Sequence, residues 1–244
     1  VCESGRRRPR PRGVGGGLTR RPPPTRPTRP GAAARDRGGR FVAEGEDLLA
    51  AADEAGWEPL ARFAAAGSGL PGIELAPEAL ASVSTLGSGT RALAVYEQRW
   101  AAPTGPLCVY LHGVRDPGNV GTVLRSALAF GAASVVLGPD CADPWGPKAV
   151  RASMGAAFAV PLARGGLADL PGERVALVAH AGEALRGPAT GPRSLLVGAE
   201  RAGLPDEVVA ACDRVAHLPI AGDSLNAAMA ATVALYELTR VPAA

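Results

Sequence analysis

Residues 107–130, LCVYLHGVRDPGNVGTVLRSALAF, join an apolar segment to a helical pattern through a turn that contains glycine. Leu107–Val114 is an almost continuous apolar run, which is typical of a strand buried on both faces. Val120–Phe130 then carries apolar residues at helical spacing. A buried strand that passes directly into a helix is the repeating unit of a parallel sheet, so this stretch predicts an α/β fold.

The same alternation continues downstream and predicts one α/β domain over residues 107–244. Expected strands are Ser134–Leu137, Ala157–Leu162, Val175–Ala179, Leu195–Val197 and Arg214–Pro219. Expected helices are Pro147–Met154, Pro205–Cys212 and Leu225–Arg240.

Upstream, the pattern predicts three further parts. Residues 35–98 form a small α/β domain, with helices over 44–55 and 77–82 and a strand over 91–96. Residues 99–106, with two prolines, form a linker. Residues 1–34 are rich in arginine, proline and glycine, and we expect a disordered basic arm.

Charge is distributed unevenly along the chain. Residues 1–40 hold twelve arginines and two acids, a net charge near +10, so the remainder is near −7 because the whole chain is +3. A basic arm suits nucleic acid, a membrane surface or an acidic partner. The composition favours the other interpretation, in which these residues are a solvated tail or an upstream stretch translated in error.

Cysteine and histidine spacings give no sign of a metal site. The four cysteines lie far apart without a C-x-x-C pair, which fits neither a zinc site nor a disulfide framework. His112, His180 and His217 share no ligand spacing and are interpreted as residues at strand ends. With no apolar run of membrane length and no signal peptide, we expect a cytoplasmic protein without a membrane partner.

The turn after the first strand contains two candidate site residues, Asn119 and Arg125. Gly118 and Gly121 do not fit G-x-G-x-x-G, and no Gly-Lys-Ser follows, which disfavours a dinucleotide or P-loop site. Six helical residues correspond to roughly 600° of rotation, so the two side chains lie on different faces. Either Asn119 caps the helix and Arg125 forms a surface ion pair, or both serve a ligand site at the strand's carboxyl end.

A second turn ends the strand that precedes Gly198. Glycine at a strand end allows backbone to approach a ligand closely. Glu200 follows two residues later and is interpreted either as a site residue or as a solvated loop acid.

A third turn precedes the final predicted helix. Asp223 or Ser224 is the predicted N-cap, which would put Asn226 in the first helical turn, where packing does not require a polar side chain. The alanines that follow would let another backbone or a flat ring come near.

Together, in order and spacing, the three turns resemble the three motifs of the SpoU/TrmH branch of the SPOUT RNA methyltransferases. The matching stretches are DPGNVGTVLRSA (116–127), VGAERAGL (197–204) and LPIAGDSLNAAMA (218–230), with PKAVRASMGA (147–156) similar to the family's connector. The likeness covers about 135 residues. Residues 40–49 and 82–95 more weakly resemble the family's small L30e-like RNA-binding domain, although the Pro-rich arm stands where the family usually has a basic helix.

The resemblance implies a parallel α/β methyltransferase domain with a trefoil knot, S-adenosylmethionine as cofactor, no metal, and a homodimer with the site beside its interface. The implied cofactor-binding residues are Gly198, Leu218, Ile220 and Leu225. The implied catalytic residues are Asn119, Arg125, Glu200, Ser224 and Asn226. Arg125 is either the base or, because arginine is almost never deprotonated, an electrostatic anchor for a phosphate and the developing alkoxide.

The expected reaction is methylation of a ribose 2′-hydroxyl in RNA. A small domain ahead of the knot favours 23S ribosomal RNA over transfer RNA. Three alternatives stay open: a non-catalytic RNA-binding protein of the same fold, an enzyme that methylates a base, and a general nucleotide-binding α/β enzyme. The polar set of all three motifs argues against the first, and the missing phosphate loop against the last.

Overall fold

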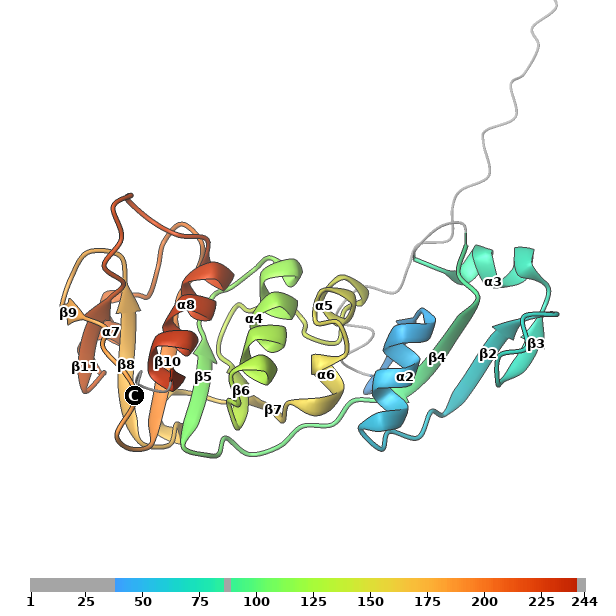
Figure 1. Ribbon diagram of the computed structural model, residues 1–244, viewed down its shortest axis with the longest axis horizontal. Coiled ribbons are helices and arrows are strands. Elements are labelled where there is room, and N and C mark those ends of the chain that lie inside the picture. The colour runs from blue at the N-terminus through green and yellow to red at the C-terminus, as the bar shows by residue number, and fades with distance from the viewer. Residues whose placement is uncertain (1–37, 86–88, 241–244) are drawn as a thin grey trace, which may run out of the picture. The chain divides into compact units, whose positions relative to one another are not determined.

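The computed structural model describes residues 38–85 and 89–240, which form two β-sheets with their helices (Figure 1). The predicted arm over 1–34 lies outside these residues. Within the part of the chain that is described, no helix is long and apolar enough to cross a membrane.

Residues 40–97 form the smaller sheet, with strand order β1-β4-β2-β3. Its elements are β1 (Arg40–Glu44), α2 (Glu46–Glu54), β2 (Ala61–Ala65), β3 (Ile73–Leu75), α3 (Pro77–Val83) and β4 (Ala92–Glu97). Strand β4 pairs antiparallel with both β1 and β2, and β3 pairs parallel with β2. The helices and the strand predicted in this region are confirmed to within about two residues.

Residues 107–217 supply the larger sheet, whose order is β7-β6-β5-β10-β8-β11-β9 with every neighbouring pair parallel. Its strands are β5 (Leu107–Leu111), β6 (Ser134–Leu137), β7 (Leu162–Arg164), β8 (Glu173–Val178), β9 (Glu183–Ala184), β10 (Arg193–Val197) and β11 (Arg214–His217). The predicted parallel α/β fold is therefore confirmed. Strand β5, which opens the domain, is an interior strand of this sheet, and all of its residues are buried.

The register of these strands brings the three motif turns to one edge of the sheet. Val197 at the end of β10 is paired with Leu111 at the end of β5 and with Leu177 near the end of β8. Leu177 is in turn paired with Ala216 of β11. Because the strands are parallel, the chain leaves all four at the same edge.

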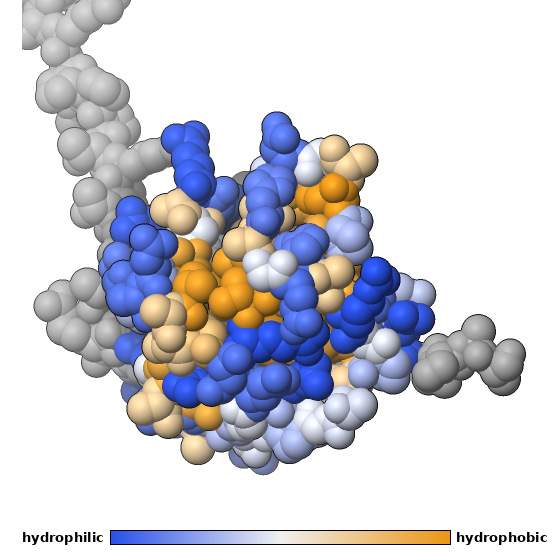
Figure 2. Space-filling model, turned by 90° about the vertical axis from the view of Figure 1, so that its left-hand side faces the viewer, coloured by the Kyte–Doolittle hydropathy of each residue, from blue (hydrophilic) through white to orange (hydrophobic). Residues whose placement is uncertain are grey.

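Helices cover both faces of the larger sheet. On one face lie α4 (Pro117–Ala129) and α8 (Ala227–Thr239), together with α5 (Pro147–Ala152) and α6 (Ala156–Ala159), and their apolar sides enter the main core. Helix α7 (Asp206–Ala210) and the 3-10 turn η1 (Leu167–Asp169) cover the other face with a smaller apolar cluster. Figure 2 views the side of the molecule that carries β9 and β11, where apolar residues gather at the centre and hydrophilic residues surround them.

One strand prediction is wrong. Residues 157–162 were expected to be a strand, but Ala156–Ala159 is helix α6, and β7 begins only at Leu162. An apolar run of this length fits a buried helix as well as a strand. The outcome is decided locally, because Gly155 turns the backbone at φ +91° and the Ser153 hydroxyl accepts a hydrogen bond from the Ala157 N–H at 3.3 Å.

The far end of α8 is seated on the segment after β9. The Gly187 N–H donates to Glu237 Oε1 at 3.0 Å, and the Ala189 N–H donates to the Leu238 carbonyl at 2.8 Å. A Cβ at Gly187 would lie 1.7 Å from the Glu237 carbonyl oxygen, so only glycine permits this approach. Helix α8 is thus fixed at a point remote from its first turn.

Candidate functional site

The N-terminus of α4 is capped by Asp116, whose Oδ1 accepts the Gly118 N–H at 2.7 Å. The same oxygen accepts a hydrogen bond from Lys148 Nζ at 2.7 Å. The alternative in which Asn119 caps this helix is therefore wrong: Pro117 starts the helix, and Asn119 lies inside its first turn.

Freed from capping, Asn119 joins the second motif to the third. Its Nδ2 donates to Glu200 Oε1 at 2.7 Å, and its Oδ1 accepts from Asn226 Nδ2 at 3.1 Å. Glu200 also accepts the Asp116 N–H at 3.4 Å. Three of the predicted site residues thus form one hydrogen-bonded network, in which Glu200 and Asn226 lie 81 and 107 positions from Asn119 in the sequence.

The network holds Glu200 as a carboxylate. Partial burial raises the pKa of Glu200, but the hydrogen bonds from Asn119 and from backbone N–H groups outweigh that effect, so its pKa lies below the ordinary glutamate value. An ionised carboxylate is an acceptor only. Glu200 is therefore suited to orient a donor and is a weak proton acceptor at neutral pH.

Asn226 has two tasks. Its Oδ1 accepts the N–H groups of Ala228 at 2.9 Å and Met229 at 3.3 Å, so Asn226 is the N-cap of α8. The prediction that Asp223 or Ser224 caps this helix is wrong, because the helix starts at Ala227, later than the apolar pattern indicated. The cap fixes the amide, which leaves Nδ2 directed at Asn119.

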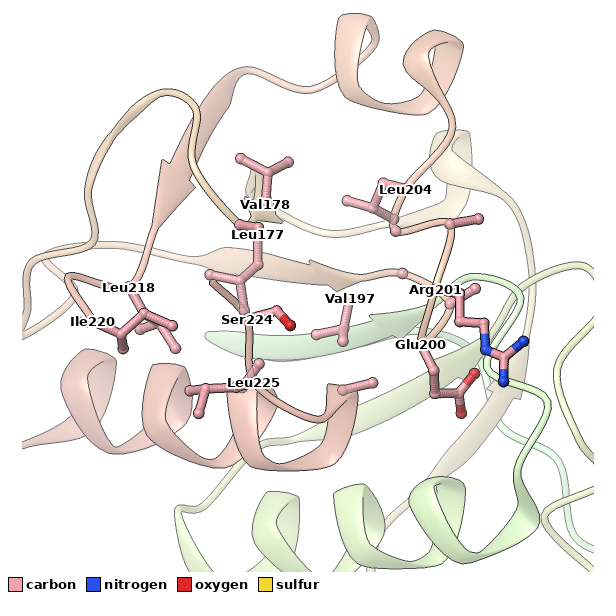
Figure 3. Close-up of a pocket in the computed structure, with 17 residues that line it drawn as sticks. Leu177, Val178, Val197, Glu200, Arg201, Leu204, Leu218, Ile220, Ser224 and Leu225 are labelled. Carbon is pink, nitrogen blue, oxygen red and sulfur yellow. The ribbon is translucent and has the colours of Figure 1, made fainter. Parts of the chain in front are cut away.

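A pocket with a volume of about 360 Å³ opens beside this network (Figure 3). Its lining combines the ends of β8 and β10 with the second and third motif turns: Leu177, Val178, Ala179, Val197, Gly198, Ala199, Glu200, Arg201, Ala202, Gly203, Leu204, Leu218, Ile220, Ser224, Leu225, Ala227 and Ala230. All four residues predicted to bind a cofactor are among them, as are Glu200 and Ser224. The lining is mostly apolar side chain and backbone, which suits a flat ring.

Gly198 is required for the shape of the pocket wall. A Cβ at this position would lie 2.1 Å from the Gly203 carbonyl carbon and 2.3 Å from the Leu204 nitrogen. Those atoms belong to backbone and cannot yield as a side chain would. The sequence predicts that Gly198 lets the backbone approach a ligand closely. In the structure, the backbone that lies closest to Gly198 is that of residues 203–204.

Arg125 is the predicted site residue that the structure does not bring into the pocket. It is an exposed residue of α4 and is absent from the pocket lining. Among residues 38–85 and 89–240 it has no hydrogen-bond or ion-pair partner, so the surface ion pair considered from the sequence is not formed there. Its charge is available to a ligand or to another chain.

Sequence reasoning missed the residues that support the network. The role of Asp116 could have been predicted, because an aspartate directly before a proline at a helix start is a common N-cap. Lys148, the only lysine of the chain, gave no such signal, since only the fold brings α5 to the start of α4. Within the described residues, no group of three His, Cys, Asp or Glu side chains is placed to hold a metal ion.

Residues 106–236 match the model of the SpoU rRNA Methylase family. A protein of Streptomyces viridochromogenes, named 23S rRNA (uridine(2479)-2'-O)-methyltransferase, is 38% identical over 145 residues, which are 51% of this chain and 49% of the relative. The chain spans about half the length of the curated relatives that it matches.

Two solved structures are similar over more of the chain. An AdoMet-bound rRNA methyltransferase from Sinorhizobium meliloti has a TM-score of 0.75 and 31% identity, covering 84% of this chain and 89% of its own. The SpoU methyltransferase AviRb from Streptomyces viridochromogenes, in complex with AdoMet, has a TM-score of 0.77 and 28% identity, covering 86% and 93%. The likeness in fold therefore extends beyond residues 106–236.

Proposed function

Because the chain belongs to the SpoU rRNA methylase family, we propose that it transfers a methyl group from S-adenosylmethionine to a ribose 2′-hydroxyl of RNA. The observation that carries the proposal is the joining of Asn119, Glu200 and Asn226 at an apolar pocket. Similarity to a relative named for 23S ribosomal RNA supports that RNA as the substrate. This substrate would place the protein in the cytoplasm.

The pocket fits the cofactor in size and chemistry. Its volume of about 360 Å³ lies in the range of small-molecule sites. Leu218, Ile220 and Leu225 offer apolar contacts to adenosine, and the backbone beside Gly198 offers donors and acceptors. The Glu200 carboxylate complements a cationic ligand. When bound, S-adenosylmethionine supplies an electrophilic methyl group on a sulfonium.

The chain's own residues then orient the nucleophile. Glu200, held ionised, accepts a hydrogen bond from the ribose 2′-hydroxyl, while the Asn119 amide, itself held by Asn226, keeps that carboxylate in place. The Ser224 hydroxyl, in the pocket lining, contributes a further donor or acceptor. Because a guanidinium is a cation that rarely serves as a base, the part of Arg125 is to bind phosphate and to stabilise the negative charge that develops on the 2′-oxygen as the proton leaves to solvent.

The proposal includes a homodimer through the outer face of α4 and α8. Leu128, Met229, Val233 and Tyr236 are large apolar residues between 43% and 62% exposed on these two helices. The helices are neighbours, since the Phe130 and Tyr236 rings lie 6.2 Å apart. Arg125 lies one turn from Leu128, which would put it beside the interface. Met229→Glu should give a monomer on size exclusion, and Met154→Glu, at a methionine that is 54% exposed, should not.

The family's trefoil knot is also part of the proposal. Its support is the seating of α8 on residues 187–189, which holds the segment after β11 against chain that precedes β10.

A direct test incubates the protein with labelled S-adenosylmethionine and total RNA and maps the labelled nucleotide. The expected product is one 2′-O-methylated nucleotide in 23S ribosomal RNA. Label in transfer RNA would show that the proposed substrate is wrong, and label on a base would show that the proposed reaction is wrong. Absence of label, with no binding of S-adenosylmethionine by calorimetry, would refute the enzyme assignment; binding of RNA alone would favour the non-catalytic alternative.

A further inference from the structure

The second motif turn is a tight loop that presents one arginine. The Ala199 N–H donates to the Gly203 carbonyl at 3.1 Å, and the Gly203 N–H donates to the Ala199 carbonyl at 2.9 Å. Residues 200–202 form the tip between these bonds, and Gly203 closes it at φ +68°. Because Gly198 packs directly on Gly203, the tip is anchored to the end of β10. Arg201 therefore projects from a well-fixed backbone.

Arg201 is an unused cation in the pocket wall. It is exposed and lines the pocket. In the described part of the chain it makes no ion pair or hydrogen bond. Two other basic residues near this edge are already neutralised, because Arg115 pairs with Asp140 at 3.0 Å and Lys148 pairs with Asp116 at 2.7 Å. Arg201 keeps a free guanidinium next to Glu200.

We propose that Arg201 binds an RNA phosphate next to the target nucleotide and so sets the position of the ribose in front of Glu200. This inference rests on the proposed function. A guanidinium forms paired hydrogen bonds with a phosphate, which fixes direction as well as distance. Arg201 follows Glu200 directly in the sequence. It is therefore well placed to hold the RNA backbone next to the ribose whose hydroxyl Glu200 orients.

The cofactor's carboxylate is another anion that an arginine in the wall could bind. The direction of the side chain favours RNA: in Figure 3 the Arg201 guanidinium lies on the side of the Glu200 carboxylate, away from Leu177, Leu218 and Leu225. Those apolar side chains mark the part of the pocket that suits adenosine. The test separates the two anions.

The experiment measures three variants against the wild type: Arg201→Ala, Arg201→Lys and Arg174→Ala. Arg174 is the matched control, because it is the second residue of β8, at the opposite edge of the sheet from the pocket, and its partner there is Asp213 at 3.1 Å. The readouts are KM for in vitro transcribed 23S RNA, kcat at saturating RNA, the dependence of RNA binding on salt, and the Kd for S-adenosylmethionine by calorimetry.

For Arg201→Ala we expect KM for RNA to rise about tenfold or more, as for loss of a charged hydrogen bond. The slope of log K against log salt should become shallower by roughly 0.7 to 0.9, the value for one phosphate. The Kd for S-adenosylmethionine should stay within about twofold of wild type. Arg201→Lys should keep the slope and recover part of KM, and Arg174→Ala should match wild type.

An unchanged KM and salt slope in Arg201→Ala would overturn the proposal. A raised Kd for S-adenosylmethionine with unchanged RNA binding would also overturn it, in favour of the cofactor carboxylate. An equal effect of Arg174→Ala would reduce Arg201 to one member of a general basic surface. Failure of the proposed function is distinguished by the wild type, which would then methylate no RNA.

Discussion

Two groups of polar residues differ in whether they already have partners. Asn119, Glu200 and Asn226 are bonded to one another, whereas Arg125 and Arg201 are not bonded to any described residue. The network is completely formed, with side-chain hydrogen bonds of 2.7 and 3.1 Å. Each arginine is exposed and without a partner in the described part of the chain. Under the proposed function, the groups that orient the hydroxyl would be prearranged, whereas the groups that meet RNA would be left free until RNA arrives.

The largest expected effect tests the free region. Arg125→Ala should lower kcat/KM about 10² to 10³-fold, the range for loss of a group that stabilises developing negative charge. Cofactor binding should persist, because Arg125 is outside the pocket lining. Single-turnover methylation and calorimetry measure the two quantities. Arg125→Lys retaining most activity would count against any need for the forked guanidinium, and full activity in Arg125→Ala would remove this residue from the mechanism.

A smaller loss is expected when the prearranged region is displaced. In Gly198→Ala the new Cβ would meet the Gly203 backbone, so the loop that carries Glu200 must shift. We expect about 10²-fold lower kcat, as for misplacement by roughly 1 Å. The free energy of unfolding should also fall by about 1–3 kcal/mol.

Steady-state kinetics measures kcat of this variant, and urea titration measures its free energy of unfolding. Gly191→Ala is its control, since that glycine, like Gly198, has no positive φ, but it has open space around it. Equal loss of kcat in both variants would contradict the contact argument.

Removing the central amide should have a moderate effect. In Asn119→Ala, Glu200 and Asn226 keep their backbone contacts but lose each other's link, so kcat should fall about tenfold or somewhat more. Helix α4 should remain, because Asp116 rather than Asn119 caps it. Circular dichroism and steady-state kinetics measure these outcomes. A helix lost together with activity would make Asn119 structural.

The smallest effect concerns the ion pair behind the network. Lys148 lowers the pKa of Asp116, chiefly through their hydrogen bond. A lowered carboxyl pKa gives stability that is present above the ordinary aspartate value of 3.8 and is lost as pH falls through the folded-state pKa. Lys148→Ala should therefore be less stable than wild type at pH 7 by under about 1 kcal/mol, because the pair is exposed.

Urea titrations of wild type and Lys148→Ala at pH 7 and below pH 3, at low and high salt, measure the difference. It should shrink in acid and in high salt. A difference that persists unchanged below pH 3 would rule out the ion pair as its cause.

The larger sheet could be predicted from the sequence because its strands are buried on both faces and carry apolar runs, as β5 does over its whole length and β10 over Leu195–Val197. The same property produced the error at 157–162, since helix α6 is also buried throughout its first three residues. Periodicity has no power where no face is exposed.

The site was accessible in part for a different reason. The motifs identified Asn119, Glu200 and Asn226, but not that Asn119 links the other two, because that depends on register across β5 and β10. The caps were assigned wrongly for α8 because Asp223, Ser224 and Asn226 are all good capping residues and the sequence does not rank them. The sequence could not predict that Arg125 and Arg201 lack ion-pair partners among the described residues. Whether an arginine is paired depends on which acidic side chains the fold places near it.

The contact of α8 with residues 187–189 means that the pocket is complete only after residues late in the chain have been synthesised and have folded. Leu225, Ala227 and Ala230 complete the pocket wall, and the helix that follows is locked only when Glu237 and Leu238 reach Gly187 and Ala189. A nascent chain that has not yet released residues 225–239 from the ribosome lacks that wall. Cofactor uptake by this pocket therefore requires that the chain has been made and folded at least as far as Leu238.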